Sequence, residues 1–67
     1  MNLEQAKQKA KDYYENEVMA KLLNTSFFSK EEQNSRLIAM REICMEIGIH
    51  EDELRAILIG CREKVNK

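Results

Sequence analysis

The amino-acid sequence predicts an all-α fold, in which residues 1–67 form a single compact domain with helices over residues 3–23, 30–47 and 51–65. Three observations support this prediction. The chain contains only two glycines and no proline, so little interrupts a helix. A residue that can cap a helix precedes each stretch, and one that can end a helix follows the first two. Apolar residues within each stretch recur every three or four positions, the spacing of an amphipathic helix.

The first helix is expected to begin after Asn2, because Gln5 follows Asn2 at the spacing of a capping box. It should end before Asn24, since asparagine tolerates the left-handed conformation that often follows a helix. Of the adjacent tyrosines, Tyr13 and Tyr14, we expect one in the core and one at its boundary. The residues of this helix that share the expected core face are Leu3, Ala6, Ala10, Tyr13, Tyr14 and Val18.

The second helix is expected to follow Ser29, which forms a capping-box pair with Glu32. Gly48 should end it, because glycine is the usual residue just past a helix end. The preceding Phe27 and Phe28 are expected to cover one end of the core. The apolar face of this helix contains Leu37, Met40, Cys44 and Ile47, with Ile43 at its edge.

The third helix is expected to follow His50, which forms a weaker capping pair with Glu53. The run Glu51, Asp52 and Glu53 places negative charge at the positive end of the helix dipole, and Lys64 and Lys67 place positive charge at the other end. The residues that form its apolar stripe are Leu54, Ile57, Leu58, Cys61 and Val65.

Composition excludes several functional classes. The net charge is −1 and acids and bases are spread evenly, so there is no basic arm for nucleic acid or an anionic membrane. No apolar run approaches the roughly 20 residues that span a bilayer, and the first residues lack the apolar centre of a secretory signal. We therefore expect a cytoplasmic protein with reduced cysteines. A Cys44–Cys61 disulfide is not expected, because the two residues lie at different heights along their helices.

The residue types that catalysis requires are largely missing. His50 is the only histidine, and its position before a helix favours a capping role over that of a base. With Cys44 and Cys61 it offers at most three soft metal ligands, at spacings that match no structural zinc pattern. There is no glycine-rich phosphate loop. We expect no enzymatic activity, no cofactor, no bound metal and no small-molecule substrate.

Residues 43–57, with the sequence ICMEIGIHEDELRAI, contain a small residue, Cys44, four positions before Gly48 and an apolar pattern around that turn. This arrangement resembles the helix-turn-helix motif, over about residues 40–59. The resemblance implies a transcriptional regulator whose last helix enters the DNA major groove. Its candidate nucleic-acid contacts are His50, Arg55 and Arg62. The acids Glu51, Asp52 and Glu53 at the tip disfavour contact with phosphates, so two helices that simply pack around a glycine are the alternative.

Several apolar residues remain after one core is assigned. They are Met19 and Leu23 in the first helix, Ile38 and Met45 in the second, and Ile59 in the third. A central second helix that packs on both neighbours would cover Ile38 and Met45. Alternatively, these residues form a surface that docks a protein partner or a second copy of the chain. We favour the second interpretation. It predicts a small regulator or inhibitor of a macromolecular partner, comparable with bacterial or phage accessory proteins, that acts alone or as a homodimer.

Overall fold

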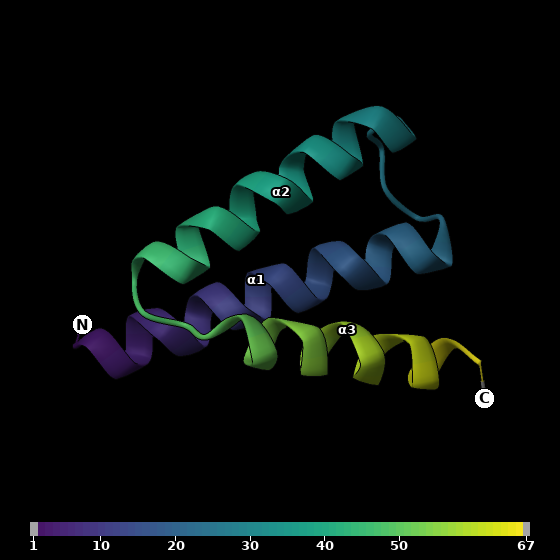
Figure 1. Cartoon of the computed structure of the whole chain (residues 1–67). Coiled ribbons are helices and arrows are strands. Elements are labelled where there is room, and N and C mark those ends of the chain that lie inside the picture. Colours follow the sequence, from purple (N-terminus) through teal and green to yellow (C-terminus); the bar gives the residue numbers. More distant parts are fainter. Residues whose placement is uncertain (1, 67) are drawn as a thin grey trace.

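Three α-helices make up the computed structural model, which describes residues 2–66: α1 (Leu3–Leu23), α2 (Lys30–Glu46) and α3 (Glu51–Val65) (Figure 1). No strand occurs among these residues. The all-α three-helix fold is therefore confirmed, and only the end of the second helix differs from its expected bound, by one residue. α2 returns along α1, and α3 then runs in the general direction of α1 (Figure 1). Lys64 lies in the last turn of α3, whereas Lys67 lies outside the described residues.

Side chains cap all three helix starts. At α1, the Gln5 N–H donates to Asn2 Oδ1 over 2.9 Å, and the Asn2 N–H donates to Gln5 Oε1 over 3.2 Å. At α2, Ser29 Oγ accepts from the Glu32 N–H. The Glu32 carboxylate accepts from the Ser29 hydroxyl and not from the Ser29 backbone N–H, so only half of the expected capping box forms. The pair at α3, expected to be weaker, does reach the backbone: the His50 N–H donates to Glu53 Oε2 over 3.0 Å.

The two expected stop signals also act as predicted. Asn24 ends α1 in the left-handed conformation, with φ 57°, and its N–H donates to carbonyl groups of the last turn. Gly48 follows α2 with φ 99°, a backbone conformation that residues with a Cβ atom rarely adopt. Gly48 also lies under a side chain of α1, because a Cβ at this position would be 3.2 Å from Lys7 Nζ. The turn between α2 and α3 is therefore suited to glycine.

Gly48→Ala is expected to lower the free energy of unfolding by about 1–2 kcal/mol, because alanine is strained at positive φ. Gly60→Ala is the matched control, since Gly60 lies within α3 and a Cβ there meets nothing within 4 Å. This second substitution should raise stability by about 0.5–1 kcal/mol. Urea denaturation followed by circular dichroism measures both changes. Equal effects of the two substitutions would contradict the role of Gly48.

α1 is the central helix, and both α2 and α3 pack on it while making few contacts with one another. This arrangement corrects the interpretation that the second helix is central. α1 supplies two buried core residues, Tyr14 and Val18, and the others come from α2, α3 and the turn between them. The complete buried apolar core is Tyr14, Val18, Cys44, Ile49, Leu54 and Cys61.

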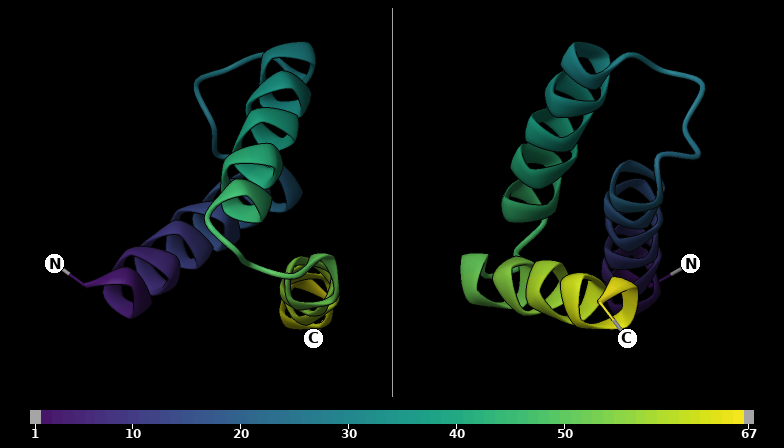
Figure 2. Two further views of the ribbon diagram at one scale, coloured as in Figure 1. Left: turned by 60° about the vertical axis from the view of Figure 1, so that its left-hand side comes forward. Right: turned by 90° about the vertical axis from the view of Figure 1, so that its right-hand side faces the viewer.

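Some residues expected in the core are exposed. Tyr14 is buried but Tyr13 is exposed, and Leu3 and Ile43 are also exposed. Phe27 is fully exposed and Phe28 is 43% exposed, so the expectation that they cover the core end was wrong. Both residues lie in the connection between α1 and α2, which arches away from the helices (Figure 2). Phe28 instead lies beneath Arg36, whose guanidinium carbon is 4.3 Å from the ring centroid.

Candidate functional site

The outer sides of α2 and α3 expose apolar side chains that the core does not use. Ile38, Met45 and Ile59 are 60%, 45% and 48% exposed. At about 100° per residue, Ile38 and Met45 lie about 100–120° around α2 from the buried Cys44. By the same measure, Ile59 lies about 160° around α3 from the buried Cys61. We name the outward residues Ile38, Glu42, Met45 and Glu46 of α2, with Arg55, Ile59 and Arg62 of α3, the α2–α3 face.

Not all of the candidate interface residues belong to this face. Met19 packs, partly buried, against the core, so the expectation that it forms part of a docking surface is not supported by its position. Leu23 is 52% exposed but occurs nine residues after Tyr14, which places it on the opposite side of α1. Ile38, Met45 and Ile59 therefore lie on the sides of α2 and α3 that point away from the core, whereas Leu23 lies on α1.

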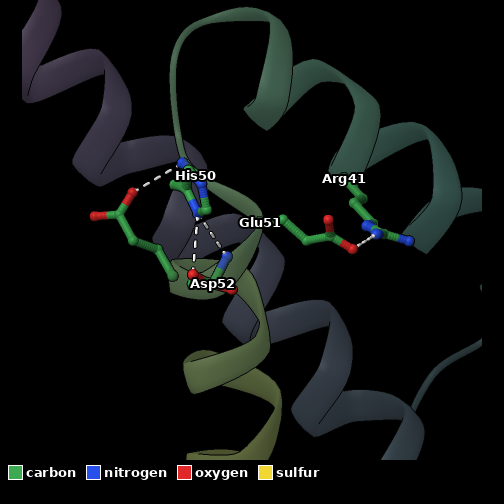
Figure 3. Close-up of polar contacts among 5 residues, drawn as sticks. Arg41, His50, Glu51 and Asp52 are labelled. Carbon is green, nitrogen blue, oxygen red and sulfur yellow. Dashed lines mark hydrogen bonds and ion pairs between the residues drawn. The ribbon is translucent and has the colours of Figure 1, made fainter.

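A shallow cavity of about 290 Å³ lies between the three helices, beside the α2–α3 face. Its lining residues are Tyr14, Arg41, Glu51, Leu54, Arg55 and Leu58. Burial raises the pKa of the Tyr14 hydroxyl, and the nearby Arg41 guanidinium partly opposes that shift. Arg41 of α2 also pairs with Glu51 of α3, which connects the two helices near their shared turn (Figure 3).

Two of the three acids at the start of α3 have cationic partners. Glu51 pairs with Arg41, and Glu53 lies 3.8 Å from Lys11 Nζ as well as accepting from the His50 N–H. Asp52 lies beside the His50 ring, with its carboxylate 3.5 Å from Nδ1 (Figure 3). The partners of Glu51 and Glu53 reduce the repulsion that these two acids would exert on a phosphate.

The three candidate nucleic-acid residues have different environments. His50 caps α3, because its Nδ1 accepts the Asp52 N–H over 3.1 Å. Arg55 and Arg62 lie on the α2–α3 face, on either side of Ile59. Neither makes an ion pair or a side-chain hydrogen bond with any residue between 2 and 66. The two arginines are thus exposed and available to a ligand.

The two cysteines serve the packing of α2 and α3 on α1. Cys44 Sγ lies 3.9 Å from the carbonyl oxygen of Ala10, and Cys61 Sγ lies 3.9 Å from that of Glu15. Both thiols are free and buried. The resemblance to a helix-turn-helix motif predicts that the small Cys44 side chain lets α2 and α3 approach one another. In the structure, the Cys44 thiol instead faces α1. Small residues at both positions allow the helices to lie close together.

Both thiols are expected to react slowly with a thiol-specific reagent until the protein unfolds. Burial raises the pKa of each thiol above its ordinary value of 9.0, so little reactive thiolate is present at neutral pH. Because the folded protein holds both thiol protons more tightly than the unfolded chain does, the free energy of unfolding should be unaffected by these groups well below pH 9 and should fall as the pH rises from about 9 through the raised pKa values. Reaction with a chromogenic disulfide, with and without urea, tests the prediction. Rapid labelling of the folded protein would contradict it.

The described part of the chain offers few other sites. Between residues 2 and 66, no three histidine, cysteine, aspartate or glutamate side chains are close enough to hold a metal ion. In the same range, no helix has the length and apolar character needed to cross a bilayer. Comparison with known protein families, characterised proteins and solved structures finds no match. Functional inference therefore depends on the surface of the protein itself.

Proposed function

We propose that this protein is a non-enzymatic interaction module that regulates or inhibits a macromolecular partner and binds it through the α2–α3 face. The proposal rests on one observation: Ile38, Met45 and Ile59 are exposed on α2 and α3, whose core contacts are made by other residues. Apolar side chains grouped in this way gain free energy when a partner removes them from water. Methionine suits such a surface because its flexible side chain adapts to different contacts.

The total exposed area also favours a docking role. A folded chain of 7.9 kDa is expected to expose about 4,400 Å², whereas this structure exposes 5085 Å². The surplus is about 700 Å², close to the roughly 800 Å² that each partner contributes to a standard protein interface. α2 and α3 both pack on α1 and make few contacts with one another, so parts of both helices contribute to this exposed area.

Affinity capture from cells that naturally make the protein tests this proposal with matched variants. Ile59→Glu and Met45→Glu place a charge on the α2–α3 face, and Leu23→Glu places one on an equally exposed residue elsewhere. Wild type and Leu23→Glu should retain the same partner, whereas the two face variants should lose it. Circular dichroism verifies that every variant remains helical. Equal capture by all variants, or capture by none, would refute the proposal.

A second candidate function is binding to duplex DNA through α3. It is favoured by the unpaired Arg55 and Arg62 and by the pairing of Glu51 with Arg41 and of Glu53 with Lys11 at the helix start. Retardation of duplex DNA should then weaken steeply with salt, and Arg55→Ala should reduce it strongly. Met45→Glu, on α2, should have little effect. Failure of the protein to retard duplex DNA at low salt would exclude this function.

A further inference from the structure

We infer that the α2–α3 face binds a second copy of this chain, with the outer side of α2 in each copy docked on the outer side of α3 in the other. This inference rests on the proposed interaction function and names the occupant. It depends on three features of the face: matched spacing, opposite unpaired charge and an area suited to a dimer.

The spacing of residues is the same on both helices. On α2, Ile38, Glu42 and Met45 follow one another at intervals of four and three residues. On α3, Arg55, Ile59 and Arg62 follow the same intervals. Each set therefore spans about 10.5 Å of helix at 1.5 Å per residue. Ile59 of one copy can insert between Ile38 and Met45 of the other, as a side chain fills the groove of a packed helix.

The charges beside these apolar residues are opposite in sign. Glu42 and Glu46 lie on the outer side of α2, and Arg55 and Arg62 lie on the outer side of α3. In the structure of residues 2–66, none of these four side chains makes an ion pair or hydrogen bond. By contrast, Glu15 and Glu17, on the sides of α1 that face the other helices, pair with Lys64 and Arg36. The α2–α3 face thus carries complementary charges that a single copy leaves unpaired.

A twofold axis allows both halves of the contact to form at once. α2 and the start of α3 lie in front of α1 in Figure 1, so both are accessible from one side. The right-hand view of Figure 2 shows α2 running crosswise to α3. A twofold rotation about an axis that lies in the plane of the α2–α3 face relates the two copies. This rotation places α2 of each copy on α3 of the other, so every contact occurs twice. An interface that covered an area equal to the surplus of about 700 Å² in each copy would bury about 1,400 Å² in total, within the range of stable interfaces.

Sedimentation equilibrium of the purified full chain tests the inference, with charge reversal as the diagnostic. The wild type should form a dimer of twice 7.9 kDa. The variant E42R/E46R makes both helices basic, and R55E/R62E makes both acidic, so each alone should dimerise at least about tenfold more weakly. Mixed in equal amounts, the two variants should form a heterodimer, because each acidic helix then meets a basic one. This recovery cannot arise from misfolding of either variant.

Leu23→Glu is the control and should dimerise as the wild type does. A wild-type chain that remains monomeric, or variants that dimerise unchanged, would overturn the inference. A monomer that still captures a different protein in a manner sensitive to Ile59→Glu would leave the interaction function standing and exclude the second copy as occupant. A chain that neither dimerises nor captures a partner would refute both the dimer and the proposed interaction function. Duplex DNA bound through Arg55 would also overturn the inference if binding required the monomer.

Discussion

Leu54→Ala is expected to lower the free energy of unfolding by about 2–5 kcal/mol. Leu54 is 2% exposed and belongs to the buried cluster that joins α3 to α1. Shortening it removes buried apolar contacts and leaves a void that the close-packed core cannot fully close. A chain of this length has a total stability of about 3–10 kcal/mol. The substitution should therefore remove a large share of the total stability, and it should leave the chain mostly unfolded at ambient temperature if the wild type lies near the lower end of this range.

Urea denaturation followed by far-ultraviolet circular dichroism measures this loss. Leu23→Ala is the matched control, because it makes the same chemical change at a residue that is 52% exposed and outside the α2–α3 face. Its effect should be within about 0.5 kcal/mol of zero. Measurements at two protein concentrations separate folding from self-association. Similar losses for Leu54→Ala and Leu23→Ala would contradict the assignment of the core.

Cys61→Leu should also destabilise the fold, by about 1–3 kcal/mol, although leucine is the more hydrophobic residue. Cys61 is 1% exposed, and its sulfur lies 3.9 Å from the backbone of α1. A longer side chain must push α3 away from α1, which weakens the contacts of the neighbouring core residues. The smaller Cys61→Ala change preserves the close approach of the helices.

Ala56→Leu provides the control for Cys61→Leu, because Ala56 is exposed in the same helix and leucine there meets no core residue. It should change stability by less than about 0.5 kcal/mol. Thermal melts of the three variants beside the wild type are sufficient to rank them. Stabilisation by Cys61→Leu would show that a void, and not a tight helix contact, surrounds Cys61.

The helices themselves could be predicted because their signals are local. The residues that start or end the helices act within one helical turn, through hydrogen bonds or backbone conformations that depend on residue type. They are Asn2, Asn24, Ser29, Gly48 and His50. The apolar stripe of α3 was likewise a reliable guide to the buried Leu54 and Cys61. Such features need no knowledge of how the helices are arranged in space.

The identity of the central helix could not be predicted in this way. α1 meets its neighbours partly through charged side chains: Glu17 lies 2.6 Å from Arg36, and Glu15 lies 2.9 Å from Lys64. Each pair joins residues distant in the sequence, so a helical pattern alone treats these residues as solvated. The wide apolar arc of α2 suggested a central position instead. The same arc contains Ile38 and Met45, whose exposure follows from α2 having only one packed neighbour.

The candidate site was partly accessible to sequence analysis. Ile38, Met45 and Ile59 were identified because their positions around each helix differ from those of the core residues, and the structure exposes all three. Their association with Arg55 and Arg62 required coordinates. The burial of Ile49 was also missed, because a residue in a turn has no helical period to follow. Binding at this face stays a prediction.

The attachment of both outer helices to α1, with little contact between them, has an energetic consequence. Substitutions in the α1–α2 contact and in the α1–α3 contact share few neighbours, so their effects on stability should be close to additive. Either outer helix can then change the residues that pack on α1 without requiring compensation in the core contacts of the other. A small chain arranged in this way can repack its interior one helix at a time.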